Sequence, residues 1–489
     1  MSRGGEAAGW WEDAVVYEVY PRSYQDSDGD GIGDLRGVES RLPYLEWLGV
    51  DAIWLAPIYP SPLADYGYDV ADHAAVAPEY GSLSDLDALI AAAHERGIRV
   101  LLDLVASHTS IAHPWFREHP DRYVWAEGPE PPNNWIASFG GSAWSRDPRT
   151  GRLYLHSFFP EQPDLDWGNP EVRRAMGDVV RFWIARGVDG FRIDAVDRLA
   201  KDPEMRSEPA ANAPFALPLH PEAMALDPIY SRNAAEIAVA LATLREAAGD
   251  APLIGEVYLP ATMLGPYLEH LDAVFAFDLL HSEWAPEALG RAVDRSREAG
   301  AVAWVTSNHD FSRVATRWGE ANARAAAVLL LTLGGTAFVY QGEEIGMADG
   351  PGTDPPLDRY DRDRFRHPMQ WAADPRGGFT EGEPWLPLTD PEGRDAASQR
   401  ADPGSTLHLF RALIRMRREL DGKPERVPAA DGVLAFRRGR HLVAINTTGA
   451  EQPIPGAGEP LLASAAGVSE LAGTARMLAP HAAVVLRAS

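Results

Sequence analysis

The sequence has 489 residues, a formal net charge of −26, 45% hydrophobic residues and no cysteine. The missing thiols exclude disulfides, thiolate metal sites and cysteine nucleophiles, and the acidic balance disfavours nucleic acids and anionic membranes as partners. A small neutral substrate is the partner that this composition suits best.

Nothing in the sequence points to a membrane or a secretory route. No apolar run approaches the roughly 20 residues that a bilayer-spanning helix needs. The start of the chain also lacks a basic stretch followed by an apolar one. We expect a cytoplasmic protein with no membrane partner, and both a monomer and a homodimer remain open.

Short β-branched and aromatic runs alternate with helical patterns along most of the chain. The expected strands lie at residues 15–20, 51–57, 99–105, 190–196, 253–258, 274–279, 302–308 and 336–342. Amphipathic patterns stand between them, for example at residues 35–49, 83–97 and 170–187, each ending in a glycine that fits a helix C-cap. Strands that are apolar on both faces and separated by helices indicate a buried parallel sheet. Eight such units predict an α/β fold of the (β/α)8 TIM-barrel type.

Two segments break this rhythm. Residues 106–168 are rich in Pro, Trp, Asn and His and are too long for a plain loop, so we expect a small inserted domain there. After a helix at 405–420, short strands with Gly and Pro turns follow at 432–439, 441–448 and 481–489. The predicted domains are therefore a barrel at 10–105 and 169–420, an insertion at 106–168, and a β-sandwich-like domain at 421–489.

Reactive side chains stand at or near the carboxyl ends of the expected strands, where barrel enzymes carry their active sites. They are Asp103, His108, Arg192, Asp194, Glu256, Asn308, His309 and Asp310. Arg192 and Asp194 are two residues apart, so both point to one face of a strand, where the guanidinium keeps the carboxylate ionised, as a nucleophile requires. Glu256 has apolar neighbours in the sequence, and such surroundings favour a protonated carboxyl that can act as an acid.

Four motifs in this order resemble the conserved regions of the α-amylase family, glycoside hydrolase family 13. They are DLVASH at 103–108, GFRIDAVD at 190–197, IGEVY at 254–258 and TSNHD at 306–310. QPDLDW at 162–167 resembles a fifth conserved region of the family, while AVVYEVYPRSYQDSDGDGIGDLRG near the start, YQGEEIGM at 340–347 and RHPMQW at 366–371 narrow the resemblance. They are similar to the subgroup that contains oligo-1,6-glucosidase, α-glucosidase, trehalose synthase and sucrose isomerase.

The resemblance implies a retaining, exo-acting α-glucosidase with a covalent β-glucosyl intermediate. In that mechanism Asp194 is the nucleophile, Glu256 the general acid/base, and Asp310 the third carboxylate, which binds the 2- and 3-hydroxyls of the sugar. Arg192 orients the nucleophile, while His108 and His309 bind the sugar in the −1 subsite.

The same resemblance implies a closed pocket that cuts from the non-reducing end. Asp65 binds the terminal hydroxyl, Tyr68 stacks on the ring, and Arg366 pairs with Asp65. Phe311 departs from the usual short polar residue or Gln, and we expect it to contact the acceptor. Residues 201–215 are also unusual and are expected to shape the plus subsites. Ala195 goes with a preference for α-1,4 over α-1,6 bonds in the resembling enzymes.

The acidic loop at residues 26–34 predicts a structural Ca²⁺ site. Clustered carboxylates with turn-forming glycines suit this hard cation, and the predicted ligands are Asp26, Asp28, Asp30, Asp34 and, by resemblance, the carbonyl of Ile32. An EF-hand would need a glutamate where Gly37 stands, so that motif is excluded. A solvated acidic turn is the alternative, and we expect no organic cofactor.

Three functions remain in competition at this point. The first is hydrolysis of short α-glucosides. The second keeps the fold but favours glucosyl transfer or isomerisation, and the product distribution separates the two. The third is a non-catalytic, glycosidase-like binding subunit, which the presence of all three acids disfavours.

Overall fold

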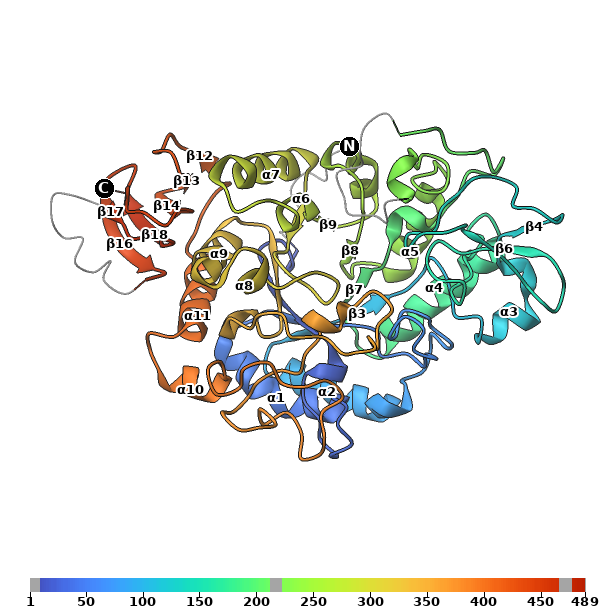
Figure 1. The fold of residues 1–489 in the computed structure, drawn as a ribbon, viewed down its shortest axis with the longest axis horizontal. Coiled ribbons are helices and arrows are strands. Elements are labelled where there is room, and N and C mark those ends of the chain that lie inside the picture. Colours follow the sequence, from blue (N-terminus) through green and yellow to red (C-terminus); the bar gives the residue numbers. More distant parts are fainter. Residues whose placement is uncertain (1–8, 212–221, 466–476, 489) are drawn as a thin grey trace. The chain divides into compact units, whose positions relative to one another are not determined.

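The protein forms a closed barrel of parallel strands, which confirms the predicted fold class (Figure 1). The computed structural model describes residues 9–211, 222–465 and 477–488. Around the barrel the strand order is β1-β11-β10-β9-β8-β7-β3-β2. Their bounds are β1 Val15–Val19, β2 Ala52–Leu55, β3 Arg99–Leu104, β7 Gly190–Ile193, β8 Leu253–Gly255, β9 Ala273–Phe275, β10 Val302–Trp304 and β11 Thr336–Tyr340.

The chain divides into two compact units, which we describe separately. The terminal unit comprises residues 1–53, 91–99 and 276–489, and the central unit comprises residues 54–90 and 100–275. In the terminal unit every residue of β1 and β11 is buried, because these strands are covered on both faces. In the central unit β3, β7 and β8 pair in parallel, with Asp103 opposite Arg192 and Ile193 opposite Gly255.

The strands end earlier than the sequence predicts. Strand β7 ends at Ile193 and β8 at Gly255, so Asp194 and Glu256 are each the first residue beyond a strand. The strand predicted at 274–279 is wrong in its second half, where the chain turns into the short helix α6, Phe277–Leu280. A short apolar run does not distinguish a strand from a buried helix, because periodicity cannot separate the two.

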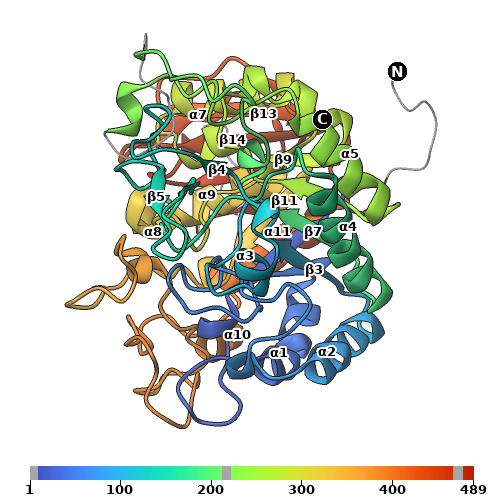
Figure 2. The ribbon, with the colours of Figure 1, turned by 90° about the vertical axis from the view of Figure 1, so that its right-hand side faces the viewer.

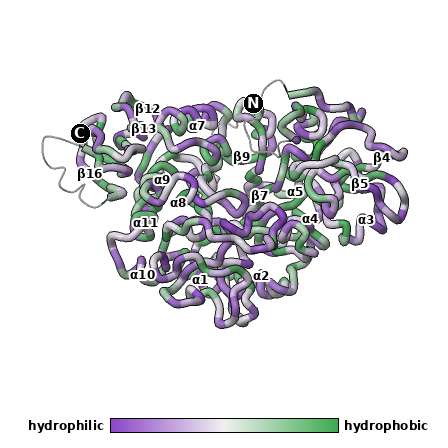
Figure 3. The backbone as a smooth tube through the Cα atoms, in the orientation of Figure 1, coloured by the Kyte–Doolittle hydropathy of each residue, from purple (hydrophilic) through white to green (hydrophobic). Residues whose placement is uncertain are grey.

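The predicted helices form at the expected places. The longer helices are α1 Leu35–Leu48, α2 Leu83–Glu95, α4 Pro170–Ala185, α5 Ile237–Ala248, α7 Pro286–Ala299, α9 Glu320–Thr332 and α11 Thr406–Arg417; the short ones are α3 Pro114–Glu118, α8 Val314–Arg317 and α10 Ala396–Ala401. In the central unit α4 and α5 lie side by side (Figures 1 and 2). Helix α9 buries most of its length because its sequence is almost wholly apolar after Arg324 (Figure 3).

The inserted segment has a small core of its own. A three-stranded sheet in the order β4-β6-β5 spans Trp125–Ala126, Leu153–Leu155 and Trp144–Arg146. Trp135 and Trp144 pack in a cluster with the buried residues of these strands. This observation fits an inserted domain, whose boundaries at 106 and 168 stay predictions.

The C-terminal strands form two antiparallel sheets. The larger one has the order β12-β13-β14-β18-β16 and the smaller one pairs β15 with β17. Their bounds are β12 Glu425–Arg426, β13 Val433–Arg438, β14 His441–Asn446, β15 Gln452–Pro453, β16 Gly458–Ala463, β17 Met477–Leu478 and β18 Ala483–Ala488. Leu442 and Val484 from the larger sheet share a core cluster with Leu478 from the smaller one. Of the predicted strand at 481–489, Ser489 lies outside the described residues.

Among the residues that the structure describes, no helix is both long and apolar enough to cross a membrane.

Candidate active site

In the central unit, one arginine holds three carboxylates. The Nη1 atom of Arg192 lies 2.8 Å from an oxygen of Asp103 and 2.8 Å from Oδ1 of Asp194, while Nη2 lies 2.7 Å from Oε1 of Glu256. All four side chains are buried. We call these residues the single-arginine group. Parallel pairing of β3, β7 and β8 brings them together, because each stands at or just beyond the carboxyl end of its strand.

The charge of Arg192 is secured by its partners. Burial by itself lowers the pKa of this guanidinium, but Asp103, Glu256, Tyr68 and Asp194 raise it well above its usual value. The guanidinium also lies over the ring of Trp54, 5.1 Å from its centroid. Arg192 therefore stays positive and holds the three carboxyl groups in place.

The surroundings of Glu256 differ from the apolar ones that its sequence neighbours predict. One of its oxygens contacts Arg192, and the other accepts a hydrogen bond from the backbone N–H of Ala195 at 3.0 Å. The difference arises because Glu256 follows β8, which pairs with β7. Arg192 lies in β7 and Ala195 just after it, so strand pairing, and not the sequence neighbours, decides what surrounds Glu256. Ala195 has a φ of 43°, in the left-handed region that is rare for residues other than glycine.

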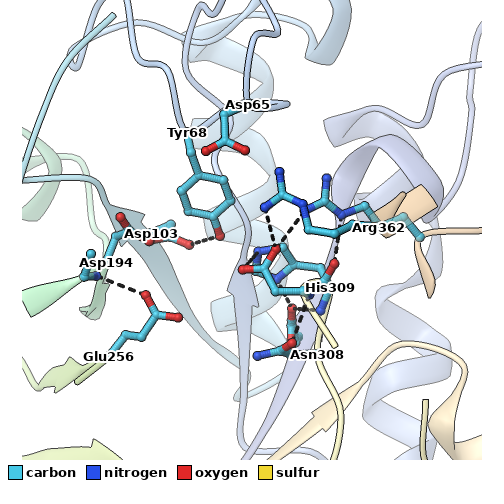
Figure 4. Close-up of polar contacts among 12 residues, drawn as sticks. Asp65, Tyr68, Asp103, Asp194, Glu256, Asn308, His309 and Arg362 are labelled. Carbon is cyan, nitrogen blue, oxygen red and sulfur yellow. Dashed lines mark hydrogen bonds and ion pairs between the residues drawn. The ribbon is translucent and has the colours of Figure 1, made fainter. Parts of the chain in front are cut away.

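Three more predicted residues gather beside this group. The hydroxyl of Tyr68 donates to Oδ2 of Asp103 at 2.9 Å (Figure 4), and Nε2 of His108 lies 3.0 Å from the carbonyl oxygen of Tyr68. The third residue, Asp65, is linked to the other two through Gln162. The side-chain amide of Gln162 donates to Asp65 at 2.9 Å and lies 3.0 Å from His108. Burial, as the largest cause, lowers the pKa of His108. The role of Gln162 was not inferred from the sequence, although it opens the quoted QPDLDW motif.

In the terminal unit, the residues after β10 form a second group. Nδ1 of His309 lies 2.6 Å from Glu18 of β1, and the backbone N–H of Asp310 donates to the side chain of Asn308 at 2.9 Å. Burial lowers the pKa of His309, but Asp310 and Glu18 more than compensate, so that the pKa is raised. Tyr20 stacks on the His309 ring at 5.8 Å.

Two arginines converge on the carboxylate of Asp310. Arg362 and Arg366 lie 3.0 and 2.8 Å from the same oxygen, Oδ1, and Arg366 also donates to the backbone oxygen of His309 at 2.8 Å. Asp358 contacts both arginines, at 2.6 and 3.5 Å respectively. We call His309, Asp310, Asp358, Arg362 and Arg366 the paired-arginine group; Figure 4 labels two of its members, His309 and Arg362.

Sequence reasoning missed Asp358 and Arg362, which lie in a charged loop before the RHPMQW motif. Arg366 was expected to pair with Asp65. Those two residues belong to different units, so that pairing stays a prediction.

Phe311 and the unusual segment after β7, residues 201–211, also make defined contacts. The Phe311 ring is partly exposed and packs edge-on against His281 at 4.7 Å. Residues 201–211 are tied to the inserted domain, because Lys201 pairs with Asp164 at 2.8 Å and Trp135 donates to the backbone of Arg206 at 2.8 Å. The rest of this predicted segment, residues 212–215, lies outside the described residues.

The acidic loop gathers three of its four aspartates. Asp26, Asp28 and Asp34 each offer an oxygen within 4.8 Å of the others. Asp26 accepts backbone hydrogen bonds from Asp28, Gly29 and Gly31, and Asp34 caps α1 through the N–H of Gly37. Asp30 is exposed and accepts from the N–H of Ile32 at 2.7 Å. Three converging carboxylates are a donor set that fits Ca²⁺.

The comparisons with known proteins agree with the motifs. A probable alpha-glucosidase of Rhizobium meliloti is 40% identical over 88% of this chain and 87% of its own length. A glucan 1,6-alpha-glucosidase of Streptococcus dysgalactiae is 35% identical over 91% of this chain and 92% of its own.

Solved structures are similar over almost the whole chain. An alpha-glucosyl transfer enzyme superposes with a TM-score of 0.91 at 36% identity and covers 98% of this chain and 100% of its own. The trehalulose synthase of Pseudomonas mesoacidophila MX-45 gives 0.88 at 30% identity over 99% of this chain and 100% of its own. Residues 18–422 match the family described as the alpha amylase catalytic domain. The chain therefore belongs to the α-amylase family and is a glycoside hydrolase.

Proposed function

We propose that this glycoside hydrolase is a retaining, exo-acting α-glucosidase that removes terminal glucose from short α-linked substrates. The observation that carries the proposal is the shared contact of Asp194 and Glu256 with one guanidinium. Retaining glycosidases need their two carboxyl groups about 5–5.5 Å apart, whereas inverting ones leave room for a water between them. One guanidinium that bridges both carboxyl groups keeps them close and supports the retaining class.

In this proposal the two carboxyl groups divide the chemistry. Asp194 attacks the anomeric carbon, while Glu256 gives a proton to the leaving oxygen; water then cleaves the glucosyl ester with Glu256 as base. The single-arginine group supports this division. If all its members were ionised, it would carry three negative charges against one positive charge, and this surplus favours a proton on one carboxyl.

The remaining predicted residues bind the sugar. Asp310 holds the 2- and 3-hydroxyls with His309 beside it. His108 and Tyr68 line the −1 subsite with Asp65 and Arg366 at its closed end, and Phe311 meets the acceptor. In this fold active sites lie at the carboxyl ends of the strands, where Asp194, Glu256 and Asp310 stand.

Glucosyl transfer or isomerisation is the second candidate. It is supported by two of the similar structures, whose names describe an alpha-glucosyl transfer enzyme and a trehalulose synthase. The chemistry up to the glucosyl intermediate is shared, and only the acceptor differs. A product screen with maltose, isomaltose, sucrose and trehalose distinguishes the candidates, because free glucose indicates hydrolysis and a rearranged disaccharide indicates isomerisation.

The stereochemical test is direct. Proton NMR of the glucose first released from 4-nitrophenyl α-glucoside should show the α-anomer before mutarotation. Initial release of β-glucose would contradict a retaining mechanism and, with it, the nucleophile role of Asp194.

We also propose that the acidic loop binds one Ca²⁺ ion. Asp26, Asp28 and Asp34 would supply carboxylate oxygens, with Asp30 and the Ile32 carbonyl as the further predicted ligands. The ion would neutralise a cluster in which carboxylates face one another and would stabilise the loop before α1.

A further inference from the structure

Asp358 lies in the loop between the 3₁₀ turns Glu343–Ile345 and Arg362–Phe365, and the loop holds its carboxylate firmly. Only 1% of the residue is exposed. Its backbone N–H donates to Asp363 at 3.0 Å, and its Oδ1 accepts the backbone N–H of Tyr360 at 2.9 Å. The carboxylate is therefore fixed before any substrate arrives.

The carboxylate of Asp358 engages one particular edge of Arg362. Nε of the arginine donates to Oδ1 at 3.0 Å and Nη2 donates to Oδ2 at 2.6 Å, which is a two-point ion pair. Nη1, on the other edge of the guanidinium, donates to Asp310 at 3.0 Å. The planar guanidinium thus acts as a relay: Asp358 fixes its orientation, and this orientation fixes the position of Asp310.

Asp358 also moderates the charge around Asp310. Two guanidiniums approach the same Asp310 oxygen, and like charges at such range repel. Asp358 adds a second carboxylate between the arginines, at 2.6 Å from Arg362 and 3.5 Å from Arg366. Burial raises the pKa of Asp358, but its bonds and charge contact with Arg362 outweigh this and lower it, so the group carries the negative charge that both arginines need.

We propose that Asp358 is a positioning residue, which aligns the two arginines so that Asp310 meets the sugar hydroxyls in a fixed orientation. The inference rests on the proposed role of Asp310 in binding the 2- and 3-hydroxyls. It assigns a function to a loop residue whose carboxylate contacts Arg362 and Arg366.

If Asp358 only anchored the loop and did not orient Arg362, its loss would change the kinetics in a different way. Loss of an anchor lowers the amount of folded enzyme and reduces the turnover of every substrate alike. Loss of the relay weakens the grip on hydroxyls that Asp310 holds, so it penalises a substrate that has them more than one that lacks one of them.

The experiment therefore compares kcat/KM for 4-nitrophenyl α-glucoside and its 2-deoxy analogue. For Asp358→Asn we expect a loss on the order of 100-fold with the glucoside, as for a small misplacement of a binding group, and a clearly smaller loss with the analogue. Asp358→Glu keeps the charge and should recover part of the difference. The ratio is measured on one preparation, so the fraction of folded enzyme cancels.

Two controls separate the possible failures. Asp361→Asn breaks the partly exposed pair with Arg364 in the same loop and should leave the ratio unchanged. Asp310→Asn should itself change the ratio. If Asp310→Asn does so but Asp358→Asn affects both substrates equally, the positioning role is wrong while the proposed function stands. If Asp310→Asn affects both equally, the role of Asp310 is wrong and the inference falls with it.

Discussion

The two arginine groups differ in charge balance. In the single-arginine group three carboxylates share Arg192. In the paired-arginine group two arginines meet the two carboxylates of Asp310 and Asp358, so that these four charges are matched, and His309 contacts Glu18 at 2.6 Å. A surplus of carboxylate suits groups that attack or exchange protons, whereas a balanced network suits a group that must stay ionised and still.

The largest effect is expected from Asp194→Asn. It removes the proposed nucleophile, and kcat should fall on the order of 10³- to 10⁶-fold. Stability should change little, because Arg192 keeps Asp103 and Glu256 as partners. Single-turnover kinetics and a thermal melt check the two halves of the prediction. Residual activity near that of the wild type would remove Asp194 from the mechanism.

The two groups should differ most clearly in the unfolding free energy that is lost when an arginine charge is removed. Arg192→Met leaves three buried carboxylates without their common partner and should cost about 3–5 kcal/mol of unfolding free energy. Arg366→Met should cost less, because Arg362 still contacts Asp310. Urea denaturation of both variants measures the difference, and equal losses would contradict the unequal balance.

The two site histidines should respond to pH with opposite signs. The pKa of His309 is raised by Asp310 and Glu18, so its stabilising contribution is full below an unfolded pKa of about 6.5 and is lost as pH rises through the folded value. The pKa of His108 is lowered by burial, so the unfolded state takes up a proton first and the free energy of unfolding decreases as pH falls below about 6.5.

The difference in melting temperature between wild type and His309→Gln should therefore shrink towards high pH. Between wild type and His108→Gln it should shrink towards low pH. Melting curves from pH 5 to 9, a range set around the usual histidine pKa of about 6.5, test both, and parallel profiles for the two variants would contradict the assignment.

The acidic loop is a third arrangement, in which three carboxylates lie close to one another. Bound Ca²⁺ would stabilise the folded state by about 2.7 kcal/mol at 100 times its Kd. Excess EDTA should then lower the melting temperature while it changes activity little at moderate temperature. Asp28→Asn should abolish the response, and Asp30→Asn, outside the close cluster, should weaken it less. An EDTA-insensitive melting temperature would favour the solvated turn.

The smallest effect concerns the bond that is cut. With Ala195 we expect a preference for maltose over isomaltose, since one or two methyl groups in a pocket change discrimination by about 1–3 kcal/mol. The structure adds a condition to the Ala195→Val test, because a β-branched residue at a φ of 43° is strained. Kinetics on both disaccharides should therefore be paired with a melt. If Ala195→Val leaves the ratio of kcat/KM for maltose and isomaltose unchanged, the linkage preference depends on the segment after β7 instead.

Local sequence predicted a large part of this molecule. The barrel strands, the long helices and the strand-end acids follow from the alternation of apolar runs and helical patterns, because burial on both faces leaves little choice of residue. The spacing of Arg192 and Asp194 likewise predicted their contact, since residues two apart share a face.

Tertiary structure decided which charges meet. Glu256 has apolar neighbours along the chain but contacts Arg192 across strands, and Arg362 and Gln162 reach site residues distant in sequence. The left-handed turn at Ala195 and the exclusion of Asp30 from the close cluster likewise depend on the path of the backbone. A carboxylate's partner is set by pairing register and loop closure over many residues, and no local pattern in the sequence encodes these distances.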